Sequence, residues 1–160
     1  MKIYHGGTDI VNAPRIIKAY TGRDFGAGFY TTSIRGQAAK WAVRQAQYRR
    51  IDEAILNTYE LDEAALSILN VRTFDGYVME WLDFVISCRQ DAAFKHGYDL
   101  VIGKIANDDV GETVQAVVDG LTSKEFALSR LAYMHANDQI CLSTESALKY
   151  LRFISAERVN

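Results

Sequence analysis

The segment 24–32 places two glycines, Gly26 and Gly28, on either side of one small residue. Glycine adopts backbone angles, and allows close approaches, that a Cβ atom forbids. The four residues that follow, 29–32, are two aromatics and two threonines, which predict a short strand leaving a glycine-rich turn. This segment constrains the fold most, because it fixes a point at which the chain must turn and then pair as a strand.

The expected strand presents two different faces. Successive side chains alternate, so Tyr30 and Thr32 share one face. Phe29 and Thr31 share the other. If Phe29 is buried, a flat ring and a small hydroxyl lie over the sheet beside bare glycine backbone, which suits a ring-bearing ligand. The same pattern also fits a glycine turn that feeds an ordinary strand, and this stretch taken alone favours that interpretation.

Composition indicates one globular domain over residues 1–160, with 49% apolar and 24% charged residues. The net charge of −2 provides no basic field, so broad affinity for nucleic acid is not expected, while a specific nucleic-acid substrate stays open. No apolar run approaches the length of a membrane span, and no apolar segment follows the N-terminal charge as in a signal peptide. We therefore expect a cytoplasmic protein without membrane contact.

The two cysteines, Cys88 and Cys141, lie inside apolar segments. We expect both to be reduced and buried, because a free cysteine packs like a small hydrophobic residue. Disulfides are also rare in cytoplasmic proteins. The chain has no cysteine and histidine spacing of the zinc type, so no metal site is expected.

The order of strand and helix signals predicts a mixed α+β fold. Strands are expected over 2–5, 29–32, 54–61, 98–105, from 139, and over 153–159, with a strand or extended connector in 66–74. Helices are expected over 34–50, from 75 to about 88, over 110–118, from 122 to about 135 and after 144, with a helical turn at 62–65. The expected helix caps are Thr32 or Ser33, Asp75, Asp108 or Asp109, the 122–125 capping box, and Ser143 or Thr144. Asp108 and Asp109 also fit a role in positioning a substrate, although capping is the default for two carboxylates at a strand end.

The helix expected over 34–50 begins directly after the glycine-rich turn and its strand. The positive end of its dipole can therefore face a phosphate near the turn. Arg35 in the first turn is unfavourable for that dipole, which suggests that it binds an anion, although a solvated surface arginine is the more common case. The residues expected to pack on the core are Ala38, Trp41, Ala42, Gln45 and Tyr48.

His5 ends the first expected strand and is followed by Gly6 and Gly7. An imidazole beside main-chain N–H and C=O groups can hold a ribose or an amide through side chain and backbone together. A histidine that only satisfies a turn carbonyl fits the same pattern.

Three separated pieces resemble a known family: Tyr4-His5-Gly6, residues 29–32, and residues 137–140. Their order and character resemble the His–Tyr–Glu pattern of ADP-ribosyltransferases of the diphtheria toxin and poly(ADP-ribose) polymerase branch. The whole chain is similar to a bacterial family of uncharacterised proteins placed near that branch. The further cues are the 24–32 run, Gln37-Ala38-x-x-Trp41-Ala42, Tyr98-Asp99-x-Val101-x-Gly103 with residues 106–109, and Thr144-Glu145-x-Ala147-Leu148.

The resemblance implies a fold of two small, mostly antiparallel sheets around an NAD cleft, with helices outside and NAD as co-substrate. It implies that His5 binds the ribose next to nicotinamide, and that the Gly6 main chain holds the carboxamide. Tyr30 would stack on the nicotinamide ring, with Thr31 and Thr32 in the place of the small hydroxyl residues beside it. The full expected cofactor-binding set is His5, Gly6, Gly28, Tyr30, Thr31, Thr32 and Arg35.

Gln139 matches the position at which that family carries its catalytic glutamate. A glutamate there grips the ribose 2′-hydroxyl and stabilises the positive charge that develops as nicotinamide leaves. Glutamine can hold the hydroxyl but supplies no such charge. Asp138 could supply that charge only if the strand were distorted, because its side chain points to the opposite face of the expected strand. Elongation of a poly(ADP-ribose) chain is therefore not expected.

The resemblance implies an NAD-dependent mono-ADP-ribosyltransferase, as in a bacterial toxin that modifies an intracellular target. Its catalytic residues would be His5, Tyr30 and Gln139. The first alternative is a catalytically degenerate module that binds NAD, ADP-ribose or a partner protein without chemistry. The second is a purely structural interaction domain. The acceptor, whether protein, nucleic acid or small molecule, and an antitoxin-like partner protein stay open.

Overall fold

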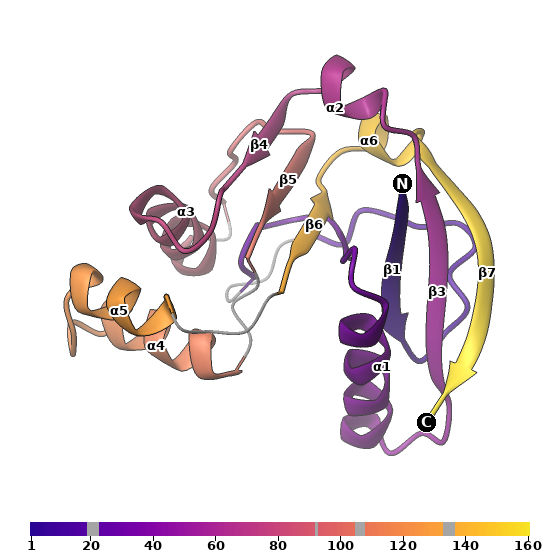
Figure 1. Ribbon diagram of the computed structural model, residues 1–160, viewed down its shortest axis with the longest axis horizontal. Coiled ribbons are helices and arrows are strands. Elements are labelled where there is room, and N and C mark those ends of the chain that lie inside the picture. The colour runs from indigo at the N-terminus through magenta and orange to yellow at the C-terminus, as the bar shows by residue number, and fades with distance from the viewer. Residues whose placement is uncertain (19–22, 92, 105–107, 133–136) are drawn as a thin grey trace.

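The computed structural model describes residues 1–18, 23–91, 93–104, 108–132 and 137–160 (Figure 1). The strands in this part of the chain are β1 Lys2–Gly7, β2 Phe29–Thr31, β3 Ala54–Leu61, β4 Val71–Thr73, β5 Leu100–Gly103, β6 Gln139–Leu142 and β7 Leu151–Val159. The helices are α1 Arg35–Arg49, α2 Ala65–Ile68, α3 Met79–Gln90, α4 Asp108–Val118, α5 Lys124–Leu131 and α6 Glu145–Leu148. The side chains of Asp108 and Asp109, expected to cap α4, lie outside the described residues.

These elements confirm the expected mixed α+β class with two sheets. The three-stranded sheet has the order β1-β3-β7, and the four-stranded sheet has the order β2-β6-β5-β4. Their strand pairs are antiparallel except β4 with β5, which run parallel. Figure 1 shows α1 beside the three-stranded sheet, whereas α3, α4 and α5 lie beside the four-stranded sheet.

A pair of backbone hydrogen bonds joins the two sheets. The Tyr4 N–H donates to the Thr32 carbonyl at 2.8 Å, and the Thr32 N–H donates to the Tyr4 carbonyl at 2.9 Å. The end of β2 therefore lies beside β1, and β2 continues into the four-stranded sheet through its pairing with β6. This sheet junction places His5, the neighbour of Tyr4, next to the strand that leaves the glycine-rich turn.

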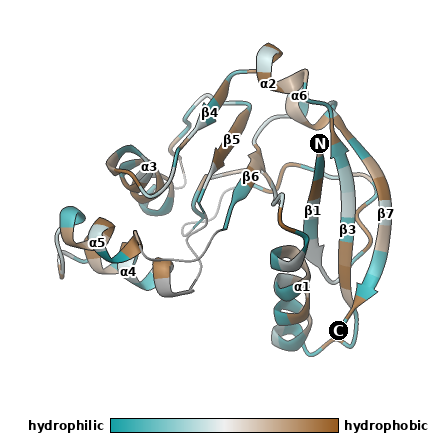
Figure 2. Ribbon diagram, viewed as in Figure 1, coloured by the Kyte–Doolittle hydropathy of each residue, from teal (hydrophilic) through white to brown (hydrophobic). Residues whose placement is uncertain are grey.

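Apolar clusters cover both faces of the four-stranded sheet. Side chains alternate along β6, so Cys141 belongs to the cluster with α3, α4 and α5, while Ile140 and Leu142 belong to the cluster shared with the three-stranded sheet. β5 is apolar along most of its length and lies between the two clusters (Figure 2). The largest fully buried side chains include Trp81, Tyr59, Phe25, Phe29, Ile3 and Leu131.

The buried face of α1 differs from the expectation. Trp41 is 47% exposed and Tyr48 is 86% exposed, so the prediction that both pack on the core is wrong. The reason is the close approach of β1, where a Cβ atom on Gly6 would lie 2.0 Å from the Ala38 carbonyl oxygen. Only small side chains fit at such a contact. The buried α1 residues are Ala38, Ala42 and Ala46.

Of the expected helix caps, Thr144 is confirmed, the 122–125 box has its cap at Ser123, one residue later than the capping-box pattern predicts, and Asp75 is wrong. Ser123 caps α5 and Thr144 caps α6, each by accepting a hydrogen bond from a main-chain N–H three residues later. α3 begins at Met79 rather than directly after Asp75. Gly76 has a φ of 94°, a left-handed conformation that is incompatible with a helix starting there.

Cys88 and Cys141 are buried and free, as expected. Burial raises the pKa of both thiols to about 12, so both remain protonated at neutral pH. None of the helices in the described ranges combines the length and the apolar character needed to cross a bilayer.

Candidate functional site at the sheet junction

The ring of His5 is fixed by two contacts at the sheet junction. Its Nδ1 lies 2.8 Å from the main-chain oxygen of Tyr30, and its ring centroid lies 4.7 Å from that of Phe29. A carbonyl oxygen can only accept, so Nδ1 carries the hydrogen and Nε2 is the acceptor of the neutral ring. Gly7 leaves room beside that nitrogen, because a Cβ atom there would stand 3.5 Å from Nε2.

Burial lowers the pKa of His5 below its usual value of 6.5, and the hydrogen bond to Tyr30 offsets part of this effect. The pKa of His96 is lowered for the same main reason. A histidine whose pKa is lower in the folded state binds fewer protons there than in the unfolded chain. The unfolded state therefore gains stability when the pH falls below 6.5.

We expect the free energy of unfolding to be highest near neutral pH and to decrease as the pH falls through about 6.5. Replacing His5 by glutamine should flatten the dependence of Tm on pH between about pH 7 and pH 5. His96→Gln is the matched control and should reduce the dependence of Tm on pH only by the contribution of His96. An unchanged slope in the double variant would show that carboxylates control this pH range instead.

Tyr30 holds the glycine-rich turn closed. Its hydroxyl donates to the Gly26 carbonyl at 2.6 Å and accepts from the Phe25 N–H at 3.2 Å. Burial raises the pKa of Tyr30, so the phenol stays neutral and continues to donate. The guanidinium carbon of Arg23 lies 5.3 Å from the ring centroid, which is cation–π distance. A nicotinamide stacked on Tyr30, as predicted, would have to use the other face of the ring or displace Arg23.

The two glycines expected to bind cofactor both make close packing contacts. A Cβ atom on Gly28 would lie 2.3 Å from the sulfur of Cys141, and one on Gly6 would meet the backbone of Ala38 in α1. The Gly28 main chain also exchanges two hydrogen bonds with Ile17, at 3.0 and 3.4 Å. Both positions therefore need glycine for packing, and their cofactor role stays a prediction.

The threonines of the 29–32 segment both bind the segment that forms β6. Thr31 Oγ1 donates to the Ile140 carbonyl at 2.9 Å. The Thr32 hydroxyl donates to the carboxylate of Asp138. Both side chains are buried. The two hydroxyls thus already have protein acceptors, and binding a cofactor would require them to accept rather than donate.

Asp138 connects the start of β6 to the start of α1. Its carboxylate accepts from the Ser33 N–H at 2.9 Å and from the hydroxyls of Ser33 and Thr32. The side-chain amide of Gln37 donates to its carbonyl at 2.7 Å. The prediction that Thr32 or Ser33 caps α1 is wrong, because the N-cap is residue 34 and has no side-chain cap bond. Asp138 instead places a negative charge near the positive end of the helix dipole.

Gln139 carries a buried polar atom for which the described part of the chain provides no hydrogen-bond partner. It is 8% exposed, and its Nε2 has no hydrogen-bond partner among the described residues. It begins β6 opposite Gly103 of β5 and, by alternation, shares a face with Cys141. A buried N–H without an acceptor costs about 1–3 kcal/mol, so such groups call for a bound water, ion or ligand.

The structure places the three expected catalytic residues on neighbouring strands. β1, β2 and β6 follow one another across the sheet junction, so His5, Tyr30 and Gln139 come from neighbouring strands. No hydrogen bond joins the three side chains to one another in the described ranges, and His5 packs on Phe29 rather than on the Tyr30 ring. Two surface hollows of about 370 and 650 Å³ are lined by other residues. Convergence of the trio on one pocket therefore stays a prediction.

Arg35, expected to serve an anion, pairs with a protein carboxylate. Its Nη2 lies 2.9 Å from Oε1 of Glu157 in β7, and both side chains are about half exposed. A surface pair of this kind contributes about 0–1 kcal/mol, so a phosphate could compete for the guanidinium. The phosphate role of Arg35 stays a prediction.

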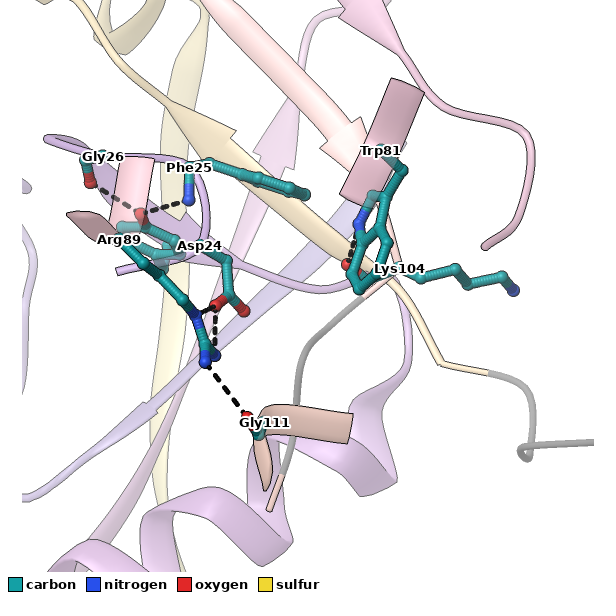
Figure 3. Close-up of polar contacts among 8 residues, drawn as sticks. Asp24, Phe25, Gly26, Trp81, Arg89, Lys104 and Gly111 are labelled. Carbon is teal, nitrogen blue, oxygen red and sulfur yellow. Dashed lines mark hydrogen bonds and ion pairs between the residues drawn. The ribbon is translucent and has the colours of Figure 1, made fainter. Parts of the chain in front are cut away.

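Sequence reasoning missed a buried ion pair beneath the glycine-rich turn. Oδ1 of Asp24 accepts from Nε and Nη2 of Arg89 in α3, at 2.8 and 2.6 Å (Figure 3). The two side chains are 8% and 14% exposed. Nη1 of Arg89 also reaches the Gly111 carbonyl in α4 at 3.5 Å. The sequence signal that could have indicated this pair is Arg89, a charged residue in the last turn of a helix that carries an apolar stripe.

Asn57 is a second polar residue that the sequence analysis did not single out. It is fully buried in β3, directly opposite His5 of β1. Its Oδ1 accepts from the Val11 N–H at 2.8 Å, and its Nδ2 donates to the Asp9 carbonyl at 3.0 Å. Asn57 therefore holds the segment after β1 against the sheet beside His5.

The fold and this site define an α+β protein in which two sheets meet at a junction carrying a fixed imidazole, a partly buried phenol and a buried amide whose Nε2 has no partner among the described residues. Residues 1–153 match the family described as "Protein of unknown function (DUF3990)", and the chain belongs to that family. No curated protein and no solved structure matches the chain. The expected membership of a family without assigned function is thereby confirmed, while its relation to ADP-ribosyltransferases stays a prediction.

Proposed function

We propose that the protein binds NAD at the sheet junction and transfers a single ADP-ribose unit to an acceptor. The observation that carries the proposal is the buried Nε2 of Gln139, which has no partner among the described residues. A ribose hydroxyl can accept from this N–H and remove the cost of leaving it unpaired. The resemblance of the separated His5, Tyr30 and Gln139 segments to ADP-ribosyltransferases supports NAD as the ribose-bearing ligand.

Each member of the trio has a definite chemical capacity. His5 is neutral with Nδ1–H bound to the Tyr30 carbonyl, so its Nε2 can accept from a second ribose hydroxyl. The Tyr30 ring offers a π face held rigid by its hydroxyl contacts. Gln139 would orient the ribose through its amide. None of these three groups carries a negative charge at neutral pH.

In the proposed reaction the bond between the ribose carbon and the nicotinamide nitrogen breaks, and nicotinamide leaves with the electron pair. The acceptor nucleophile then bonds to that carbon and loses its proton to water. Positive charge develops on the ribose, and an amide dipole stabilises it less than a carboxylate does. We therefore expect slow transfer of single units.

A second candidate function is NAD or ADP-ribose binding without chemistry. It is favoured by the neutral Gln139 together with the position of Asp138, whose carboxylate is occupied by Thr32 and Ser33. The nearest carboxylate in sequence therefore does not replace the missing acid. In this case the protein would hold the dinucleotide and release no nicotinamide.

The test is calorimetry with NAD, followed by incubation of the protein with labelled NAD and cell lysate. His5→Ala and Gln139→Ala should each weaken NAD binding about tenfold, since each removes one hydrogen bond to a buried group. Gln115→Ala is the matched control, because Gln115 is exposed and its side-chain amide donates to Asp119, directly after α4. Binding with labelled acceptor or nicotinamide release supports the transferase, and binding without either supports the second candidate. Absence of NAD binding by the folded wild-type protein would reject both.

A further inference from the structure

The exposed side of α1 concentrates cations and aromatic rings. The helix contains four lysine or arginine residues and no acidic residue, in a chain whose net charge is −2. At 100° per residue, one arc of about 100° holds two cations and two rings. We call this arc the basic aromatic face. Its residues are Lys40, Trp41, Arg44 and Tyr48.

The basic aromatic face lies opposite the alanines that pack on the sheet. Trp41 is 47% exposed and Tyr48 is 86% exposed, and both cations are exposed as well. Figure 1 shows α1 beside the three-stranded sheet and away from α3, α4 and α5. Single exposed apolar residues are common on monomers, but two large rings and two cations on one face of a helix form a larger mixed patch, which is typical of a binding surface.

We propose that the basic aromatic face of α1 binds a single-stranded nucleic acid. Lys40 and Arg44 lie one turn apart and can contact successive phosphates, while Trp41 and Tyr48 can stack on bases. The two rings are seven residues apart, or about 10 Å along the helix. A strand with about 3.4 Å between stacked nucleotides spans this distance in about three steps. The face therefore matches a short unpaired segment.

The aromatic rings distinguish this partner from the alternatives. An acidic protein segment would neutralise the two cations but would leave no partner of matching chemistry for both rings. In a nucleic-acid duplex the base faces are already stacked, so the rings could not insert without unpairing it. The net charge of the chain is negative, but a nucleic-acid contact needs a positive potential only over the surface that binds phosphate. The cations of α1 provide that potential locally. The proposal does not depend on NAD binding.

The test measures fluorescence anisotropy of a labelled 12-nucleotide single-stranded RNA, and of the same sequence as DNA, at several salt concentrations. Removing both cations in Lys40→Ala/Arg44→Ala should weaken binding about tenfold or more and reduce the salt slope by about 1.4, or 0.7 for each lost phosphate contact. Removing both rings in Trp41→Ala/Tyr48→Ala should weaken binding at least about tenfold with the slope unchanged. Intrinsic fluorescence adds a direct readout, because Trp41 is exposed and should be quenched by stacking, whereas Trp81 is fully buried.

The matched control is Phe126→Ala/Arg130→Ala on α5, which removes one exposed ring and one exposed cation at the same one-turn spacing. It should leave RNA binding unchanged. The proposal is overturned if the wild-type protein does not bind at low salt, if the control weakens binding as much as the α1 variants, or if duplex binds as tightly as single strand. Tighter binding of a poly-glutamate peptide would likewise overturn it in favour of an acidic protein partner.

Discussion

Replacing Asp24 by alanine should lower the free energy of unfolding by about 3–5 kcal/mol, because it leaves the Arg89 guanidinium buried without its carboxylate. The two side chains are 8% and 14% exposed, so bulk solvent screens the remaining guanidinium charge only slightly. The pair also connects the glycine-rich turn to α3, and Arg89 reaches α4 through Gly111. Urea unfolding followed by circular dichroism measures the change.

The control for this prediction is an exposed pair with the same separation. Nζ of Lys124 lies 2.6 Å from Oδ1 of Asp83, as close as Arg89 Nη2 is to Asp24, but both side chains are about half exposed. Asp83→Ala should therefore cost only about 0–1 kcal/mol. The double variant Asp24→Leu/Arg89→Met should recover most of the stability, because it removes both buried charges. Equal costs for Asp24→Ala and Asp83→Ala would show that burial is not the reason for the effect.

Replacing Gly6 by alanine should destabilise the protein by about 3 kcal/mol, at the upper end of the cost of overpacking. The new methyl group would stand 2.0 Å from the Ala38 carbonyl oxygen and 2.9 Å from the Ala42 nitrogen. Both are backbone atoms of α1, so no side chain can rotate away and the helix itself must move. Thermal unfolding of the variant measures the loss.

Gly36 provides the matched control on the same helix. A Cβ atom there would meet no atom within 4 Å, so Gly36→Ala adds the same methyl group without a clash. We expect it to stabilise the protein by up to about 1 kcal/mol, since alanine loses less backbone entropy than glycine in a helix. If Gly6→Ala unfolds at the wild-type temperature, the contact between β1 and α1 is not the constraint on that position.

Local patterns predicted the elements around the candidate site. The strand after the glycine-rich turn, the strand that begins at Gln139 and the cap at Thr144 all form as expected. Each depends on alternation or on a hydrogen bond between residues three apart, and such signals lie within a short window of sequence. The predicted start of α3 was wrong because a glycine turn at residue 76 lies between Asp75 and the helix.

The sequence by itself determined the mixed α+β class, the strands that carry His5, Tyr30 and Gln139, and the buried free cysteines. Only the tertiary structure decided which groups those residues meet. The Asp138 carboxylate accepts a hydrogen bond from the Thr32 hydroxyl, although the two residues are 106 positions apart in the sequence. Asp24 pairs with Arg89 across 65 positions. The tertiary structure also turned Trp41 toward solvent, because the approach of β1 admits only alanines. Contacts between distant segments depend on how whole elements pack, and no periodicity within a single element encodes them.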